Sequence, residues 1–250
     1  MVKRDFHIHT VFSDGRYTPE ELLQYGLSIG MTHIGFSDHS YTPFDDSYCL
    51  SEDGEEAYKA EVLSLREKYR GRIEVYLGIE EDYYSKKSAE GYDYKIGSVH
   101  YVLADGEYLP VDKSAADLRD AVEKHFGGDP VAFCEAYFET VGDVVNKTGC
   151  DIIGHFDLCT KFNEKDPYID ESDPRYRAAW KKAVDKLISY GKLFEINTGV
   201  IPRGYKSCPY PSKPIFEYIK ERGGRFILSS DSHKLTLCHG FEAWKEKYEL

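Results

Sequence analysis

Residues 4–23 read RDFHIHTVFSDGRYTPEELL, a stretch that joins a strand pattern, ionisable side chains and a helix start. His7 and His9 stand two positions apart in an otherwise apolar run. Neighbouring side chains on a β-strand point to opposite faces, so residues two apart share one face. We therefore expect the two imidazoles to converge on one point, with Asp14 in the loop that follows.

A helix start comes directly after this loop. Thr18 suits the N-cap position, Pro19 suits the first helical position and Glu21 completes a capping box. Gly30 then provides an end for the helix. The stretch thus predicts one complete unit of strand, loop and helix.

The rest of the chain repeats this order. Short runs rich in β-branched and aromatic residues predict seven strands, at residues 5–10, 33–38, 73–80, 94–102, 150–157, 192–199 and 225–233. Helical patterns cover residues 19–30, 55–69, 130–147, 174–190, 212–222 and 240–250. Such alternation predicts a parallel sheet closed as a single-domain α/β barrel, (β/α)7, over residues 1–250. Residues 103–115 contain a hairpin-type turn, Asp105-Gly106, and are expected to decorate the barrel rim.

Composition argues against several classes of protein. The chain has 44 acidic and 32 basic residues, a formal net charge of -12, whereas nucleic-acid and membrane-surface binders present positive faces to phosphate. No apolar run approaches about 18 residues, and the N-terminus does not resemble a signal peptide. The six cysteines show no CxxC spacing. We therefore expect a cytoplasmic protein with free thiols, of unknown oligomeric state.

Metal-type side chains concentrate where the predicted strands end. They are His7, His9, Asp14, Asp38, His39, Glu80, His100, His155, Asp157, Asp231 and His233. Six of the nine histidines belong to this set, and only the strand end at LFEINTG lacks such a residue. Any single histidine could be a packed core residue, but core histidines have no reason to choose one rim of a sheet. The set therefore predicts a metal cluster at the C-terminal ends of the strands.

The order of these motifs resembles the PHP (polymerase and histidinol phosphatase) superfamily. The motifs are HIHTVFSDG from His7, FSDHS from Phe36, GIE from Gly78, GSVH from Gly97, IGHFD from Ile153 and SSDSH from Ser229. EINTGVIPRG at 195–204 and YPS at 210–212 are similar to the late motifs of the histidinol-phosphatase branch. The resemblance covers nearly the whole chain. It implies a distorted seven-stranded barrel that holds up to three metal ions and hydrolyses phosphate esters.

The resemblance also implies the ligands. One ion is surrounded by His7, His9, Glu80 and Asp231; a second is held by His39, His233 and Asp14; and a third is held by Glu80, His100 and His155. Imidazole and carboxylate ligands without thiolate suit two to three divalent ions of zinc, iron or manganese, among which the sequence does not choose. Asp14 could instead be an ordinary turn residue, and Asp38 could support a ligand or cap a turn.

Phosphate also needs cations that do not bind metal. Arg203 lies in the loop after LFEINTG, where we expect its guanidinium to grip two phosphate oxygens from the side opposite the metals. Lys161 and, less strongly, Lys206 are further substrate-binding candidates. Asp157 lies two residues after His155 and could support that ligand or, as a catalytic residue, donate a proton to the leaving group.

These features lead us to expect a metal-dependent phosphomonoesterase. Its metal-activated hydroxide would hydrolyse L-histidinol phosphate to L-histidinol and phosphate, a step of histidine biosynthesis, with no nucleic-acid or membrane partner. One alternative is a PHP phosphoesterase for another small phosphate ester or a nucleotide, since fold and metals would be shared. The other is a non-enzymatic module that metal stabilises.

Overall fold

A computed structural model describes residues 3–86, 88 and 90–249 of the chain. One sheet has the strand order β1-β2-β3-β4-β7-β8-β9, with every pair parallel. Its strands are β1 (Arg4–Asp5), β2 (His33–Phe36), β3 (Glu74–Asp82), β4 (Tyr94–Ser98), β7 (Ile152–Ile153), β8 (Leu193–Asn197) and β9 (Arg225–Ser229). All seven predicted strands are therefore present.

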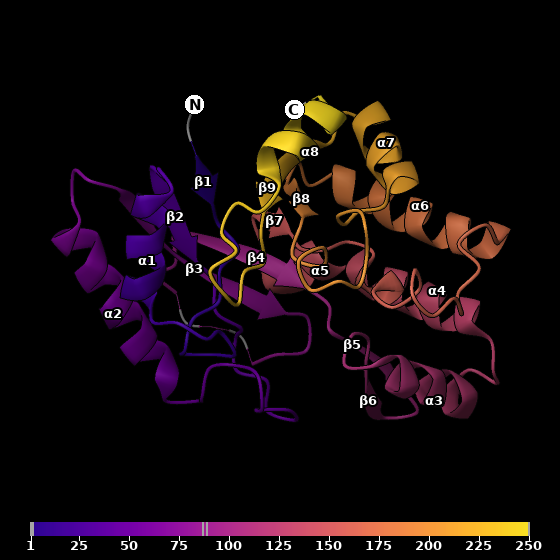
Figure 1. Ribbon diagram of the computed structural model, residues 1–250. Coiled ribbons are helices and arrows are strands. Elements are labelled where there is room, and N and C mark those ends of the chain that lie inside the picture. Colours follow the sequence, from indigo (N-terminus) through magenta and orange to yellow (C-terminus); the bar gives the residue numbers. More distant parts are fainter. Residues whose placement is uncertain (1–2, 87, 89, 250) are drawn as a thin grey trace.

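The first and last strands meet beyond their regular ladders. A parallel bridge joins Ile8 to Ser232, where His9 N donates to the Ser232 carbonyl at 2.9 Å. The sheet is thereby a nearly closed barrel, as predicted (Figure 1). Regular pairing of β1 ends at Asp5, so the segment that carries His7 and His9 is extended chain rather than the six-residue strand we expected.

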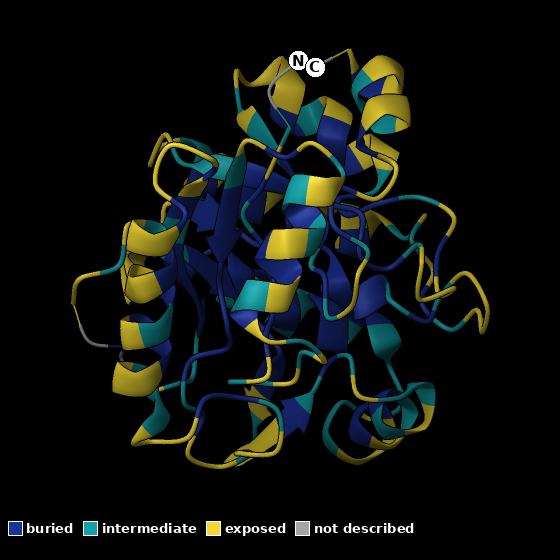
Figure 2. Ribbon diagram, turned by 60° about the vertical axis from the view of Figure 1, so that its left-hand side comes forward, coloured by how far each residue is buried: buried dark blue, intermediate teal, exposed yellow. Residues whose placement is uncertain are grey.

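Helices cover the outside of the barrel (Figure 1). They are α1 (Pro19–Ser28), α2 (Gly54–Lys68), α3 (Ala115–His125), α4 (Pro130–Val141), α5 (Val144–Thr148), α6 (Pro174–Ile188), α7 (Lys213–Glu221) and α8 (Phe241–Tyr248), with a 3-10 turn η1 at Leu158–Thr160. Most residues of the barrel strands are buried, whereas the helices turn an exposed face outward (Figure 2). This amphipathic pattern is why the sequence periodicity located most of the helices.

Helix α1 begins as its sequence predicts. The Thr18 side chain accepts from Glu21 N at 3.3 Å, and a Glu21 carboxylate oxygen accepts from Thr18 N at 2.9 Å. Both halves of the capping box are therefore formed, and they fix where the chain leaves the Asp14 loop.

Two predicted segments differ from the structure, and one helix is additional. The helix expected over 130–147 is divided into α4 and α5, because the chain turns at Gly142 and Asp143. Helix α3 was not predicted, although Ser114 caps it by accepting from Asp117 N at 3.0 Å. The expected strand 94–102 is broken after Ser98, where the chain leaves the barrel.

The segment that leaves the barrel forms the predicted hairpin. Strands β5 (Tyr101–Ala104) and β6 (Glu107–Pro110) pair antiparallel. Asp105 and Gly106, the two residues between them, have φ angles of 51° and 83°. Positive φ at both central positions is the geometry that favours Asp-Gly in a tight hairpin turn.

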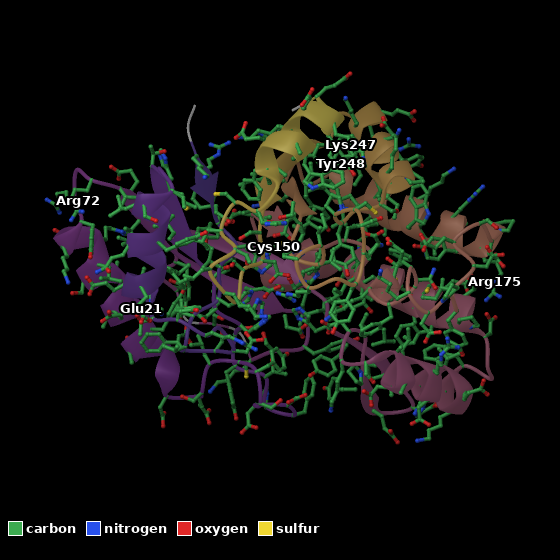
Figure 3. The ribbon with its side chains drawn as sticks, viewed as in Figure 1. Glu21, Arg72, Cys150, Arg175, Lys247 and Tyr248 are labelled. Carbon is green, nitrogen blue, oxygen red and sulfur yellow. The ribbon has the colours of Figure 1, made fainter. Side chains whose placement is uncertain are left out.

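The cysteines are unpaired, as expected. Cys150 is fully buried and lies in the interior, whereas charged side chains such as Arg72 and Arg175 lie at the periphery (Figure 3). Within the described part of the chain, no helix combines the length and the apolar character needed to cross a membrane.

Candidate metal centre

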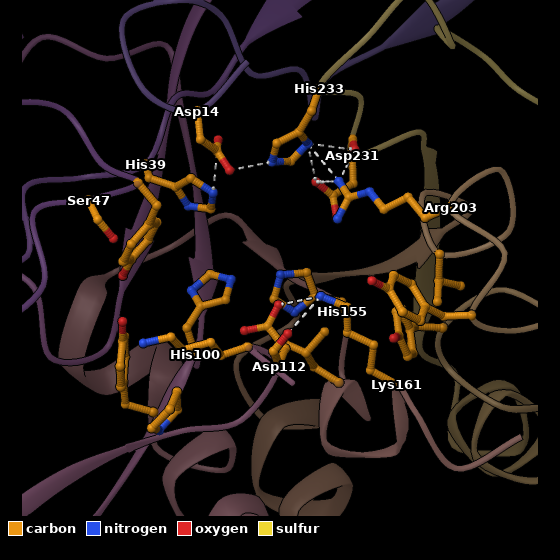
Figure 4. Close-up of a pocket in the computed structure, with 18 of the residues that line it drawn as sticks. Asp14, His39, Ser47, His100, Asp112, His155, Lys161, Arg203, Asp231 and His233 are labelled. Atoms are coloured by element: carbon orange, nitrogen blue, oxygen red, sulfur yellow. Dashed lines mark hydrogen bonds and ion pairs between the residues drawn. The ribbon is translucent and has the colours of Figure 1, made fainter. Parts of the chain in front are cut away.

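The nine predicted metal ligands gather at the carboxyl end of the sheet, because each follows or ends a parallel strand. His7 and His9 follow β1, His39 follows β2, and Glu80 lies near the end of β3. His100, His155 and Asp231 follow β4, β7 and β9 in the same way. Figure 4 shows Asp14, His39, His100, His155, Asp231 and His233 around one cavity. The structure thus brings these side chains together at one end of the barrel, and their role as ligands stays a prediction.

Glu80 is the centre of this arrangement. Its carboxylate is 1% exposed and faces five imidazoles. Oε2 lies 2.8 Å from His39 Nδ1, 3.3 Å from His7 Nε2 and 3.5 Å from His9 Nε2, and Oε1 lies 3.0 Å from His155 Nε2 and 3.7 Å from His100 Nε2. One carboxylate that faces ligands on both of its oxygens has the geometry of a bridge between ions.

Two further carboxylates face the same histidines from the cavity side. Asp14 Oδ2 lies 3.1 Å from His233 Nε2, and Asp14 Oδ1 lies 3.6 Å from His39 Nε2. Asp231 Oδ1 lies 3.2 Å from His9 Nε2. Asp14 is therefore placed among ligand-type groups rather than in an isolated turn.

The geometry defines three overlapping groups that could each hold an ion, with ligand atoms within 4.8 Å of one another. They are His7, His9 and Glu80; His9, Asp14, His39 and His233; and His39, Glu80 and His100. The first group contains three of the four ligands expected for the first ion. The second contains all three ligands expected for the second ion, together with His9. In the third, His39 takes the place expected for His155, which nevertheless lies 3.0 Å from Glu80.

Buried polar atoms in this cluster lack ordinary partners. His7 Nε2, both ring nitrogens of His9, His39 Nδ1 and Glu80 Oε2 form no hydrogen bond of ordinary geometry within the described residues. They lie close to one another instead, with His39 Nδ1 2.8 Å from Glu80 Oε2. Buried nitrogen and oxygen atoms without partners are costly, and native proteins pair them with protein, water or metal. Imidazole and carboxylate donors aimed at common points fit divalent ions such as zinc, iron or manganese.

The electrostatics favour the ligand forms of Glu80 and His9 but not those of three other imidazoles. Burial raises the pKa of Glu80, but the nearby His39, His7 and His100 outweigh it and hold that pKa well below the usual range. Burial lowers the pKa of His9, and the neighbouring His233 and His39 lower it further. An ionised carboxylate and a neutral imidazole are the protonation states that bind metal. Burial lowers the pKa of His7, His39 and His100, but nearby carboxylates, Glu80 among them, outweigh it and raise all three, that of His100 to about 9. These three imidazoles would therefore have to release a proton when an ion binds.

Two buried carboxylates that the sequence does not single out hold candidate ligands in place. Glu195, fully buried in β8, lies 2.5 Å from His7 Nδ1 and accepts from His155 N at 2.7 Å. Asp82 lies 3.2 Å from His100 Nδ1 and accepts from His100 N at 2.8 Å. Such carboxylates orient imidazole ligands and raise their basicity.

The strand LFEINTG therefore contributes to the site after all. Its end has no metal-type residue, as the sequence indicates, but Glu195 contacts His7 from inside the strand. Asp38 has a comparable supporting place. It accepts from Thr10 N and Thr10 Oγ1, both at 2.8 Å, and from the Ser13 hydroxyl, and so fixes the loop after His9.

The cavity above the cluster has a volume of about 450 Å³. Its lining combines ligand residues with cations, acids and tyrosines: Asp14, Arg16, His39, Asp45, Ser47, Tyr48, His100, Tyr101, Pro110, Asp112, Lys113, His155, Leu158, Lys161, Val200, Arg203, Tyr205, Tyr210, Asp231, His233 and Lys234. The volume is of the order that a small-molecule site needs.

Arg203 lies in this cavity, but not opposite the ligands as we expected. Its Nη2 donates to the Asp231 carbonyl at 2.8 Å and lies 2.6 Å from His233 Nδ1 and 3.3 Å from Asp231 Oδ1 (Figure 4). The loop after β8 folds back over the end of β9, which brings the guanidinium beside the ligands. An arginine in this place can contact an anion that is itself bound at the metals.

The two lysine candidates have different surroundings. Lys161 lines the cavity, and its Nζ donates to the Asp112 carboxylate at 2.8 Å and to the Asp112 carbonyl at 2.9 Å. Lys206 is not part of the lining; it is buried, donates to Thr160 Oγ1 at 2.7 Å and lies over the Tyr210 ring. This placement argues against direct substrate binding by Lys206.

Asp157 is also outside the cavity lining. Its side chain is fully buried and accepts from Ser212 N at 3.0 Å. The chain turns into η1 directly after it, so Asp157 does not share the face of His155 as a continued strand would have required. This position argues against the role of proton donor to a leaving group.

Comparison with known proteins gives one family and several relatives. The family model described as PHP domain matches residues 5–199. A "Probable histidinol-phosphatase" of Schizosaccharomyces pombe is 30% identical over 237 residues, which cover 86% of this chain and 74% of that protein. A protein of the same description from Deinococcus radiodurans is 30% identical over 241 residues, with 92% and 86% covered.

A solved structure has the same fold. The histidinol phosphate phosphatase of Lactococcus lactis subsp. lactis, in complex with zinc, L-histidinol and phosphate, superimposes with a TM-score of 0.73 at 21% sequence identity. The match covers 98% of this chain and 93% of that one.

Proposed function

Because this chain belongs to the PHP domain family and carries a cluster of metal-type ligands under a small cavity, we propose that it is a metal-dependent histidinol-phosphatase. The reaction hydrolyses L-histidinol phosphate to L-histidinol and phosphate. The relatives described as histidinol-phosphatases support this substrate, as does the related structure that holds zinc, histidinol and phosphate.

The observation that carries the proposal is the set of buried, unpartnered ligand atoms around Glu80. We assign His7, His9, Glu80 and Asp231 to one ion, and His39, His233 and Asp14 to a second. Glu80, His100 and His155 would hold a third. The count of two to three ions, and the choice among zinc, iron and manganese, belong to this proposal.

Divalent ions bound in such a cluster would lower the pKa of bound water and neutralise the negative charge of the phosphoryl group. The chain's own residues position the substrate. The Arg203 guanidinium can donate to two phosphate oxygens, and Lys161 can approach the same group from another part of the lining. To contact phosphate, Arg203 would have to break some of its contacts with Asp231 and His233.

A side-chain nucleophile is not needed, and the nearby serines are poorly placed to act as one. The Ser13 hydroxyl donates to Asp38, and the Ser229 hydroxyl donates to Glu195 at 2.5 Å. Both hydroxyls thus have structural partners rather than a histidine base that would activate them.

Steady-state kinetics on a panel of phosphate esters test this function. We expect kcat/KM for histidinol phosphate to exceed the values for p-nitrophenyl phosphate and nucleoside monophosphates by a wide margin. If a nucleotide is the best substrate, a PHP phosphoesterase of other specificity remains and the histidinol-phosphatase proposal fails. If no ester is hydrolysed with manganese or zinc present, the chain is a non-enzymatic metal-binding module.

A further inference from the structure

The cavity has a second wall that neither the proposed ligands nor the phosphate contacts use. It is built by the loop after His39 and by the base of the β5–β6 hairpin. Its lining residues are Asp45, Ser47, Tyr48 and Tyr101. Figure 4 shows Ser47 across the cavity from Arg203 and Lys161, so this wall faces the cations over the open space.

A fixed carboxylate is the main polar group of this wall. One oxygen of Asp45 accepts from the Tyr101 hydroxyl at 2.8 Å, and the other accepts from the Ser47 hydroxyl at 2.6 Å and from Ser47 N at 3.2 Å. Burial raises the pKa of Asp45, but the bonds from Ser47 and Tyr101, together with the charge of Lys113, outweigh it and lower that pKa. The group is therefore an oriented, ionised acceptor.

Asp45 differs from the other three carboxylates of the cavity. Asp14 faces His39 and His233, Asp231 pairs with Arg203, and Asp112 pairs with Lys161. Among the described residues, Asp45 has no basic side chain within ion-pair distance; Lys113, which also lines the cavity, acts on it through its charge alone. Its remaining acceptor capacity is available to a molecule in the cavity.

Two aromatic rings belong to the same wall. The Tyr48 ring meets the His39 ring edge to face at 4.9 Å, and the Tyr101 ring lies 6.4 Å from Tyr48 at 35°. Flat apolar faces beside a hydrogen-bond acceptor suit a small heteroaromatic ring that carries an N–H.

We propose that Asp45, with Tyr48 and Tyr101 beside it, is a specificity-determining residue that accepts a hydrogen bond from the imidazole N–H of the substrate. This inference rests on the proposed histidinol-phosphatase function. Imidazole has an N–H donor whether neutral or protonated, so the contact does not depend on its charge state. The phosphate and the imidazole are the two ends of the substrate, and they would be held at opposite walls of the cavity.

The test compares Asp45→Asn with Asp46→Asn, the matched change at the exposed neighbour that does not line the cavity. The readout is the ratio of kcat/KM for histidinol phosphate to kcat/KM for p-nitrophenyl phosphate, which has no imidazole. We expect Asp45→Asn to lower this ratio by roughly ten- to a hundredfold, because a site built for a donor discriminates by this contact. Asp46→Asn should keep the wild-type ratio.

Two further measurements separate recognition from structural damage. L-histidinol, used as a product inhibitor, should bind more weakly to Asp45→Asn, while bound metal per chain and the melting temperature match those of Asp46→Asn. Tyr101→Phe keeps the ring but removes the hydroxyl that orients Asp45, and it should lower the ratio in the same direction by a smaller factor. If Asp45→Asn does not fold, the ratio measured for Tyr101→Phe tests the inference instead.

An unchanged ratio in folded Asp45→Asn, or in Tyr101→Phe if only that variant folds, would overturn the inference. Wild-type kinetics distinguish this from failure of the proposed function. If the wild-type enzyme prefers histidinol phosphate and Asp45→Asn keeps that preference, only the role of Asp45 is wrong. If the wild-type enzyme has no such preference, both proposals fail.

Discussion

The floor and the rim of the cavity use the same types of side chain but hold them differently. On the floor, the side chains of His7 and His9 are fully buried and that of Glu80 is 1% exposed. At the rim, the side chains of Asp14 and Arg203 are 34% and 30% exposed. The floor is fixed by buried carboxylates behind it, whereas the rim residues contact one another next to solvent.

This difference suggests a division of tasks. Ligand groups that are buried and preset lose little further freedom when an ion binds, so the floor suits tight metal binding. Side chains next to solvent can change partners, so the rim suits exchange of substrate and product. Substitutions at the floor should therefore remove metal, and substitutions at the rim should weaken substrate use first.

The largest effect is expected for Glu80→Gln. An amide is a poorer metal ligand and cannot provide the negative charge that faces several imidazoles, so the variant should lose bound metal and at least about a hundredfold in kcat/KM. Elemental analysis and kinetics on the purified variant measure both losses. His33→Gln is the matched control, because His33 lies at the start of β2, next to Thr32, and outside the cavity lining. Equal metal content in the two variants would show that the site is misplaced.

A rim substitution, Arg203→Ala, should come next. Losing one charge-assisted, two-pronged phosphate contact should lower kcat/KM for histidinol phosphate by roughly ten- to a thousandfold. Because the floor ligands remain, we expect most of the bound metal to stay. Arg222→Ala removes an arginine that pairs with Asp185 on the surface and serves as the control. If Arg203→Ala empties the metal site as Glu80→Gln does, Arg203 belongs functionally to the floor.

The smallest effects separate the two lysines. Lys161→Met should lower kcat/KM by about three- to thirtyfold, since it removes a single cation from the cavity wall. Lys206→Met removes a buried ammonium that donates to Thr160, so it should lower the melting temperature while its effect on kcat/KM stays below that of Lys161→Met. Kinetics and thermal unfolding of both variants provide the comparison. A larger kinetic loss in Lys206→Met would mean that Lys206 reaches the substrate.

The position of the floor residues can be predicted from the sequence, whereas the residues that support them cannot. His7 and His9 can be recognised as candidate ligands from the sequence, because strand periodicity and the end of a strand are local features. Glu195 cannot: it lies 188 residues from His7 in sequence, and its role appears only when β1 and β8 are placed around the same barrel. An acidic residue inside a strand gives no local sign of the imidazole that it will orient.

Two other differences have physical causes of the same kind. The predicted strand 94–102 is continuous in its apolar and aromatic pattern, yet the chain bends at His100, whose backbone N–H is taken by Asp82. Lys206 belongs to a polar segment, but that segment folds against Thr160 and Tyr210 and buries the ammonium. In both cases a distant partner, absent from the local pattern, decides the outcome.

Metal removal and reconstitution test the central claim most directly. The purified protein is stripped with a chelator, its residual metal is verified by elemental analysis, and turnover of histidinol phosphate is followed as Mn²⁺, Zn²⁺ or Fe²⁺ is added back. We predict no turnover in the stripped protein, a lower melting temperature, and recovery of both as two to three ions bind per chain. Full turnover in verified metal-free protein would contradict the account.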